Sequence, residues 1–191
     1  MNEHQRIAMV VVGVTGHRNS LDTESIPSGV DRALNKINEV FPGESLIILS
    51  PLAEGADRLV VHRAMEMFNV QLVVPLSLAV NEYMLDFNTE SSRNEFAHLL
   101  DQANQVLEIP ASKNREDSYL AAGLYVLDNS DVLIALWDGQ PARGPGGTGQ
   151  IVTKARDKKI PIAWVFACQE NLPSNPAYQK KPGEVTFENF P

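Results

Sequence analysis

The 191-residue chain has one cysteine, Cys168, and no long apolar run. A single cysteine cannot form an intramolecular disulfide bond, which favours a reducing compartment and a cytoplasmic location. No segment reaches the roughly 20 apolar residues that span a bilayer, and residues 1–4 lack a signal-peptide pattern. These absences predict a soluble protein without a membrane partner.

Basic residues are also scarce. Lysine and arginine number 16 against 24 aspartates and glutamates, which gives a formal net charge of −8. A general nucleic-acid binder needs a basic face, so this charge disfavours a nucleic-acid partner while leaving room for a local cationic pocket. There is no G-x-S-x-G motif, and His62 and His98 lack the spacing of a zinc pair. Neither a hydrolase of that type nor a metal site is expected.

Short apolar runs and helical patterns do alternate along the chain. Strands are expected at 7–14, 46–49, 70–74, 106–109, 131–136 and 160–166, and helices at 25–40, 55–68, 92–103, 117–127 and 147–158. This order predicts an α/β fold, a three-layer sandwich with a mostly parallel central sheet. Residues 1–167 are expected to form one domain. Residues 168–191, which include Pro173, Pro176 and Pro182, are expected to be an irregular tail or linker.

The most informative segment lies between the expected strand 131–136 and the helix that follows it. Residues 137–150 read Trp-Asp-Gly-Gln-Pro-Ala-Arg-Gly-Pro-Gly-Gly-Thr-Gly-Gln. Glycines let the backbone approach a ligand, and the first turn of the next helix favours an anion. Arg143 adds a planar cation that suits phosphate. The alternative is a surface loop whose glycines only turn the chain.

Two other polar segments follow expected strands. In residues 15–18, Gly16 allows a tight turn and Arg18 can reach an anion, although 13–18 contains only G-x-x-G and not the dinucleotide fingerprint. In residues 50–58, Asp57 is interpreted as a ligand for a ribose hydroxyl or, alternatively, as a helix-start carboxylate. Tyr83 is interpreted as core packing or as a base-stacking residue. Ligands of parallel sheets bind at the carboxyl ends of the strands, so these segments are expected to converge.

With these residues in hand, the chain resembles the SLOG superfamily, which joins the bacterial DNA-processing protein A and the LOG, or "lysine decarboxylase-like", proteins. Residues 50–57 match much of the S-G-x-A-x-G-I-D element of the first branch, and 145–149 match the start of the LOG element P-G-G-x-G-T-x-x-E. Uncharacterised bacterial members carry G-V-T-G-H-R, A-E-G-A-D-R and W-D-G-x-P-A-R-G-x-G-G-T, all present here. The resemblance covers about residues 7–166 and implies a Rossmann-like fold that binds nucleotides or nucleotide-derived ligands.

The chain departs from the LOG pattern at two positions. LOG enzymes cleave the glycosidic bond of a nucleoside monophosphate with the glutamate that ends the motif and an arginine on the preceding helix. Thr153 and Ala122 stand at these positions. Without that carboxylate and cation, neither the developing oxocarbenium ion nor the phosphate is stabilised in the family's way. Phosphoribohydrolase activity is therefore not expected.

The sequence thus predicts a domain that binds a nucleotide or nucleotide-derived small molecule as a sensor or recognition module. The phosphates are expected on the glycine loop, held by Arg143 and Arg18, and Asp138 is expected to bind a ribose hydroxyl or a Mg²⁺ that arrives with the nucleotide. The expected ligand-binding residues are Gly16, His17, Arg18, Glu54, Gly55, Ala56, Asp57, Arg58, Asp138, Gly139, Arg143, Gly146, Gly147, Thr148 and Gly149.

Three further expectations stay open. One alternative is an enzyme that cleaves the glycosidic bond of a nucleotide or NAD-like substrate, with Glu54 or Asp138 as the working carboxylate. Another is a DNA-binding module of the DNA-processing type, which the net charge disfavours. Finally, the apolar residues of helix 117–127 exceed one core-facing stripe, which predicts a homodimer contact or, alternatively, a helix buried on two sides within one chain.

Overall fold

The computed structural model describes residues 8–18, 24–110, 114–142, 144–168 and 180–191. Its elements are β1 (Met9–Gly16), α1 (Ser25–Val40), β2 (Ser45–Leu49), α2 (Ala56–Met67), β3 (Gln71–Leu76), α3 (Val80–Tyr83), the 3-10 helix η1 (Met84–Asp86), α4 (Glu90–Asp101), β4 (Gln105–Glu108), α5 (Arg115–Asp128), β5 (Val132–Trp137), α6 (Thr148–Asp157), β6 (Ile162–Phe166) and β7 (Val185–Glu188). Every expected helix and strand is present, with ends that differ by two residues at most.

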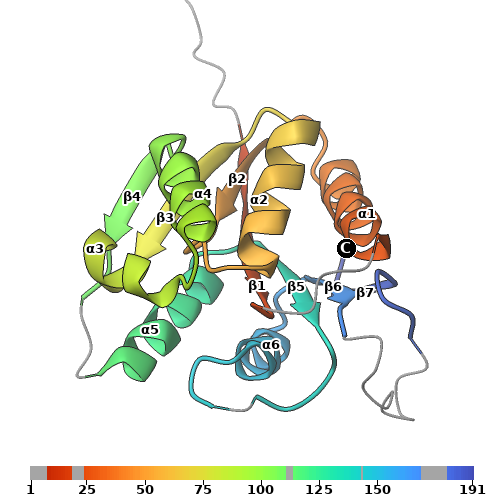
Figure 1. Ribbon diagram of the computed structural model, residues 1–191. Coiled ribbons are helices and arrows are strands. Elements are labelled where there is room, and N and C mark those ends of the chain that lie inside the picture. Colours follow the sequence, from red (N-terminus) through yellow and green to blue (C-terminus); the bar gives the residue numbers. More distant parts are fainter. Residues whose placement is uncertain (1–7, 19–23, 111–113, 143, 169–179) are drawn as a thin grey trace, which may run out of the picture.

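The strands form one seven-stranded sheet in the order β4-β3-β2-β1-β5-β6-β7. All neighbouring pairs are parallel except β6 and β7. The chain builds outward from β1 to β4 and then returns to the other side of β1, so the strand order reverses between β1 and β5. In Figure 1 the parallel strands point downward, and their carboxyl ends lie on the side of α5 and α6.

Buried apolar side chains form a core on each face of the sheet. Val60 of α2, Phe96 of α4 and Ile134 of β5 belong to the core on one face, whereas Ile151 of α6 and Leu133 of β5 belong to the core on the other. Ile134 and Leu133 are neighbours in β5, and successive strand residues point to opposite faces. A strand covered on both sides is therefore apolar throughout, as the sequence pattern indicates. The predicted three-layer sandwich is confirmed.

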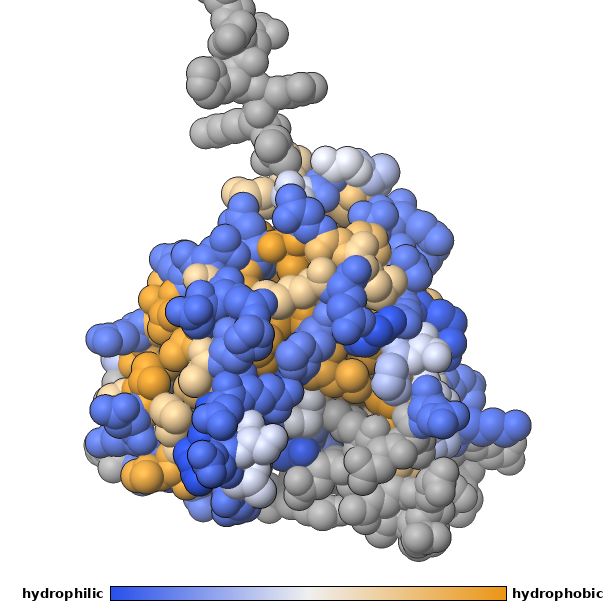
Figure 2. All heavy atoms as spheres, turned by 45° about the horizontal axis from the view of Figure 1, so that its top comes forward, coloured by the Kyte–Doolittle hydropathy of each residue, from blue (hydrophilic) through white to orange (hydrophobic). Residues whose placement is uncertain are grey.

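The molecular surface is mostly hydrophilic on the face shown in Figure 2. Hydrophobic residues reach the surface at the left of that view, the side on which Figure 1 places β4 and α3. Leu85 and Val106 are among the exposed large apolar residues. Within the described part of the chain, no helix has both the length and the apolar character needed to cross a membrane.

The last strand differs from the expectation of an irregular segment after residue 167. β7 pairs antiparallel with β6, placing Thr186 opposite Trp164. Arg156 of α6 also donates hydrogen bonds of 2.7 and 2.8 Å to the two carboxylate oxygens of Glu188. The strand has four residues, too few to show a periodicity, and it forms because β6 offers it an edge.

Pro75 is a second difference, because the expected strand 70–74 ends before it, whereas β3 includes it. The register between β3 and β2 ends at Val73, and beyond that residue β3 pairs only with β4. The missing N–H of the proline therefore costs no hydrogen bond to β2, and the strand continues to Leu76.

The apolar residues of α5 pack within the chain. Leu127 is buried, and Leu120 and Leu124 are partly buried against the core beneath α6. Tyr119 packs against the core on the opposite face. Contact with both cores accounts for the wide apolar surface of α5. This surface therefore no longer supports a subunit contact, and the homodimer remains a prediction.

Candidate functional site

A cavity of about 460 Å³ opens at the carboxyl ends of β1 and β5, where the strand order reverses. We call it the switch-point cavity. The loops after β1, β2, β3 and β5 line it, together with α5 and the first turn of α6. Open α/β sheets bind their ligands at this position. The predicted site residues in its lining are Gly16, His17, Arg18, Asp57, Asp138, Gly146, Gly147, Thr148 and Gly149.

The remaining predicted residues have other positions. A more open hollow beside α4, which we call the α4 hollow, is lined by Glu54, Gly55 and Arg58, with Arg18 shared by both. Ala56 is buried, and its Cβ lies where a side chain at Gly16 would have to go. Gly139 borders neither space. Arg143 lies outside the described residues. The three predicted segments thus meet, but they divide between two adjoining hollows.

The glycines of the loop between β5 and α6 serve two purposes. Gly146 has a φ of +75°, and a Cβ there would lie 2.8 Å from the backbone nitrogen of Leu120. A Cβ at Gly149 would lie 2.7 Å from the backbone nitrogen of Ala142. These two glycines let the loop pack closely against α5 and α6. By contrast, the Cβ position of Gly144 faces open space, so this glycine on the cavity wall is accessible to a ligand.

The first turn of α6 presents backbone donors to the cavity. The N–H groups of Gln150 and Ile151 both donate to the carbonyl of Gly147, whereas those of Thr148 and Gly149 make no hydrogen bond to another described residue. The first turn of α6 carries no acidic residue, and its basic residues lie in the last turn. Nothing on the helix therefore neutralises the positive end of its dipole, the arrangement in which helices bind phosphate.

His17 and Asp138 join the two strands at the reversal point. His17 Nε2 lies 3.1 Å from Asp138 Oδ1 and 3.2 Å from the Asp138 backbone nitrogen. The backbone N–H of Gln140 also donates to Asp138 Oδ1, at 2.9 Å. A neutral imidazole accepts from the backbone N–H, and a protonated one donates to the carboxylate. The pair thus offers the cavity an imidazole whose orientation is fixed in either protonation state.

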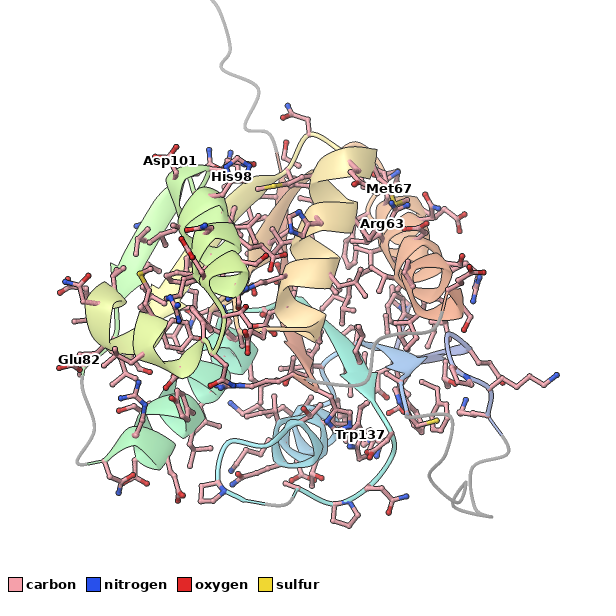
Figure 3. All side chains as sticks on the ribbon, viewed as in Figure 1. Arg63, Met67, Glu82, His98, Asp101 and Trp137 are labelled. Atoms are coloured by element: carbon pink, nitrogen blue, oxygen red, sulfur yellow. The ribbon has the colours of Figure 1, made fainter. Side chains whose placement is uncertain are left out.

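Trp137 fixes the start of the same loop. Its indole Nε1 donates to the carbonyl of Gln140 at 2.8 Å, and its ring stacks obliquely on Trp164 with centroids 5.2 Å apart. Figure 3 shows Trp137 where β5 ends beside α6. Trp137 also belongs to the cavity lining, next to Asp138.

Asp57 is a buried carboxyl group on the cavity wall, only 4% exposed. Its Oδ2 accepts a hydrogen bond from the Ala53 backbone at 3.1 Å. Burial raises the pKa of Asp57 from 3.8 to about 7, although this hydrogen bond, a second from Ser50 and the charge of Arg18 oppose the rise. Burial, and then the charge of Asp57, also raise the pKa of Tyr83 on the same wall. Near neutral pH the cavity therefore contains a carboxyl group that is partly protonated.

The sequence analysis did not identify Tyr119 as a site residue. The guanidinium carbon of Arg18 lies 4.9 Å from the centroid of the Tyr119 ring. The Tyr119 hydroxyl donates to Asp86 and accepts from Arg115 Nε at 2.9 Å, and Arg115 also pairs with Asp86. The hydrogen bonds of its hydroxyl fix the position of the Tyr119 ring. The ring in turn makes a cation–π contact with Arg18 at the cavity. The helical spacing of Tyr119 in α5 indicated only an apolar surface.

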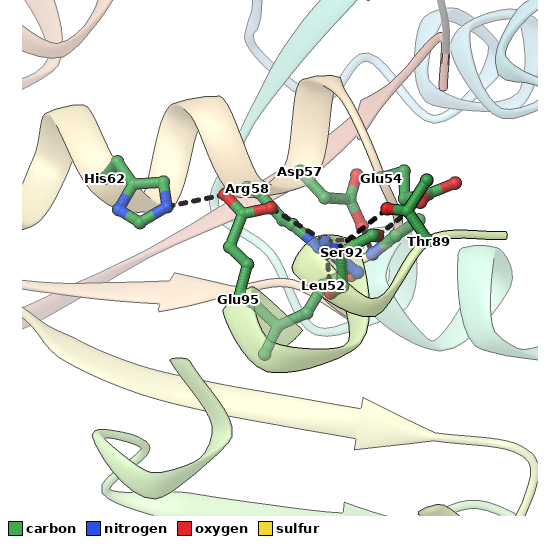
Figure 4. Close-up of polar contacts among 9 residues, drawn as sticks. Leu52, Glu54, Asp57, Arg58, His62, Thr89, Ser92 and Glu95 are labelled. Carbon is green, nitrogen blue, oxygen red and sulfur yellow. Dashed lines mark hydrogen bonds and ion pairs between the residues drawn. The ribbon is translucent and has the colours of Figure 1, made fainter. Parts of the chain in front are cut away.

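The Arg58 side chain makes its hydrogen bonds to α4 and to Leu52, and it does not line the switch-point cavity. Nε donates to the Leu52 carbonyl at 3.1 Å, and Nη1 donates to the Ser92 carbonyl and hydroxyl at 2.9 Å and to Glu95 Oε2 at 2.8 Å. The Ser92 hydroxyl donates in turn to the Glu54 carboxylate. Figure 4 shows this network, which joins the start of α2 to α4. The sequence analysis did not identify Ser92 or Glu95, because their roles depend on contacts with Arg58 from a distant segment.

The two positions that depart from the LOG pattern also differ in location. Ala122 lines the switch-point cavity, so the family's arginine would reach it from this position. Thr153 is exposed on α6 outside that lining, and its hydroxyl donates to the Gly149 carbonyl at 2.8 Å. Among the described residues, no three His, Cys, Asp or Glu side chains gather as a metal site.

Comparison of the chain with protein-family models and with curated proteins finds no match, so what the site binds has to be argued from its own geometry.

Proposed function

We propose that the chain binds a nucleotide or nucleotide-derived small molecule in the switch-point cavity and serves as a sensor or recognition domain in the cytoplasm. The observation that carries the proposal is the start of α6, where the Thr148 and Gly149 amides lack partners among the described residues beside an open cavity. A phosphate supplies both the acceptor oxygens and the negative charge that this helix end favours.

The rest of the cavity supports the same ligand class. Its volume of about 460 Å³ suits a small organic ligand, since such sites commonly measure roughly 300–1,000 Å³. Arg18 provides a cation for phosphate, and Asp138 provides acceptors for ribose hydroxyls, while Trp137 and Tyr119 add aromatic surface for a base. A Mg²⁺ would arrive with the phosphates, and Asp138 in the cavity lining is the carboxylate that would hold it. The motifs shared with the SLOG superfamily agree with this proposal.

The test is to place a charge beside the proposed phosphate. Gly144 lines the cavity, and a side chain built there meets nothing within 4 Å. Gly144→Glu is expected to weaken AMP binding, measured by isothermal titration calorimetry, by tenfold or more, because two negative charges then share one site.

Gly144→Gln is the matched control, because it has nearly the same shape and no charge. It is expected to bind AMP within about threefold of the wild-type protein, a difference below about 1 kcal/mol. Equal affinities for the glutamate and glutamine variants would show that phosphate binds elsewhere, and the absence of any nucleotide binding by the wild-type protein would refute the proposal.

A second candidate function is cleavage of a nucleotide glycosidic bond. The observation that favours it is the pair formed by His17 and Asp138 opposite a buried Asp57 whose pKa is raised to about 7, since acid–base chemistry uses groups that titrate near neutrality. Of the two carboxylates first considered, Asp138 lines the cavity, whereas Glu54 lies in the α4 hollow. Release of adenine from AMP, followed by chromatography, would establish this activity; intact AMP after long incubation would exclude it for that substrate.

A further inference from the structure

The part of the switch-point cavity beside β3 contains buried polar side chains that a bound phosphate does not explain. Ser77 follows β3 and Tyr83 ends α3, and both line the cavity together with Asp57. Their exposed fractions are 6%, 5% and 4%, so all three belong to the interior of the protein. β1 and β2 separate β3 from β5, the strand that leads to α6. We call the part of the cavity at these three residues the β3 end.

The hydroxyl groups of Ser77 and Tyr83 have no partner within the described part of the chain. Among the interior side chains described, Arg58 alone has a polar atom that is both unpaired and buried from solvent. The Ser77 and Tyr83 hydroxyls are unpaired but not buried in this sense, so each is open to the cavity that it lines. A ligand that displaces water from these hydroxyls has to replace its hydrogen bonds, so the two groups select for a polar ligand.

The surroundings of Tyr83 orient its hydroxyl toward the cavity. Its ring packs edge-on against Phe87 and Phe96, with centroids 5.3 and 5.5 Å apart, and both phenylalanines are buried in the core. Burial raises the pKa of the Tyr83 hydroxyl most, and the charges of Asp57 and Arg18 also shift it, which places the hydroxyl near these two lining residues. The ring therefore belongs to the core, and the hydroxyl belongs to the cavity.

The charges at the β3 end favour a neutral ligand group. Asp57 is a buried carboxyl group, which disfavours a second anion beside it, and Arg18 is the cation that the phosphate requires. Hydroxyl groups both donate and accept, so they suit a group that carries donors and acceptors together. Apolar residues of the lining include Pro51, Pro75 and Ala122. A nucleobase combines the required properties, because it is neutral and flat and has hydrogen-bonding groups along its edge.

We infer that the nucleobase of the ligand lies at the β3 end, where the hydroxyls of Ser77 and Tyr83 bind its edge and determine specificity. The phosphate stays at the start of α6, and the base lies on the side of Tyr119 rather than beside Trp137. This inference rests on the proposed function and names its substrate class: a nucleotide with its base intact, in preference to a sugar phosphate.

The experiment compares the tightest-binding of AMP, GMP, CMP and UMP with ribose 5-phosphate, which lacks the base. In calorimetric titrations the wild-type protein is expected to bind the nucleotide at least tenfold more tightly. Tyr83→Phe removes one hydroxyl and keeps the ring that packs on Phe87 and Phe96. It is expected to weaken nucleotide binding by about three- to tenfold, the range of one hydrogen bond, without changing the affinity for ribose 5-phosphate. Ser77→Ala is expected to have the same selective effect.

Tyr125→Phe is the matched control, because it removes the same hydroxyl from a residue of α5 outside the cavity lining. It is expected to bind both ligands as the wild-type protein does. Because the Tyr83 hydroxyl has no partner among the described residues, Tyr83→Phe is also expected to unfold at the wild-type urea concentration. A clearly lower midpoint would show that the hydroxyl serves the fold and would overturn its assignment to the ligand.

The remaining outcomes separate the inference from the proposed function. Equal affinities of the wild-type protein for the nucleotides and ribose 5-phosphate would overturn the inference and leave the proposed function standing. Unchanged nucleotide affinity in both Tyr83→Phe and Ser77→Ala would overturn it too, since the base would then lie elsewhere, as beside Trp137. Equal losses for the nucleotide and ribose 5-phosphate would assign the hydroxyls to the sugar or phosphate instead. No binding of any of these compounds would refute the proposed function itself.

Discussion

Replacing Asp57 with asparagine is expected to remove a large pH dependence from the stability of the protein. Burial raises the pKa of this carboxyl group from 3.8 to about 7. A difference of that size corresponds to about 4 kcal/mol of folding free energy, of which roughly 2–3 kcal/mol develops between pH 5 and pH 8. Asparagine is neutral throughout this range, and its amide oxygen can still accept from the Ala53 backbone.

The sign of the effect follows from where the proton is bound. Between pH 3.8 and about 7 the folded state holds a proton on Asp57 that the unfolded state releases. Raising the pH through this window therefore destabilises the wild-type protein, and the contribution is constant above it. Relative to wild type, Asp57→Asn is expected to be more stable at pH 8 than at pH 5 by about 2–3 kcal/mol.

Urea unfolding of both proteins at pH 5 and pH 8 measures this difference directly. Asp101→Asn is the control, since Asp101 is exposed at the outer end of α4, as Figure 3 shows. Its substitution makes the same chemical change without affecting a buried carboxyl group. If Asp57→Asn and Asp101→Asn show the same pH dependence, Asp57 is ionised in the folded protein at neutral pH.

Replacing Arg58 with methionine is expected to destabilise the protein by about 3–5 kcal/mol, because its buried guanidinium is the donor to several acceptors and each buried acceptor left unsatisfied costs about 1–3 kcal/mol. Methionine keeps much of the apolar stem that packs on Phe87, whose ring centroid lies 4.4 Å from the guanidinium carbon. It leaves the Leu52 and Ser92 carbonyls without their donor. These unsatisfied carbonyl groups produce the loss, whereas Glu95 keeps its contact with His62.

Arg63→Met provides the comparison on the same helix. Arg63 makes two hydrogen bonds of 2.7 Å to Asp31, but its side chain is 30% exposed, and Figure 3 shows it on the side of α2 that faces α1. Ion pairs that water can reach contribute about 0–1 kcal/mol, so its loss is expected to be smaller than that of Arg58. Guanidinium unfolding of the two variants measures the contrast. Similar losses would mean that the Arg58 network in Figure 4 contributes no more than a surface pair.

The order of elements could be predicted because each local pattern agreed with its environment. β5 is apolar at every position because it is covered on both faces, and the loop after it contains glycines because the backbone turns there. β7 could not be predicted in this way, since its four residues form a strand only because β6 lies beside them. Pro75 likewise fits inside β3 only because β2 no longer pairs with β3 at that position, and the sequence of β3 alone does not show where this pairing ends.

The candidate site could be predicted where its residues follow strands. His17, Asp57 and Asp138 meet in one cavity because the carboxyl ends of parallel strands lie together. Tyr119 and Ser92 lie in helices, and their roles depend on which side chains from other elements approach them. Such contacts arise from packing between distant segments, so no short sequence motif indicates them.

The pairing of β7 with β6 also determines how the sheet ends. Ile162–Phe166 is buried throughout and contains no charged residue or proline. If its outer edge were open, its unpaired N–H and C=O groups would form a template onto which a strand of another molecule could add. β7 occupies that edge, and it is itself short, with Glu188 bonded to Arg156. β7 therefore covers an apolar edge to which a strand of another molecule could otherwise add.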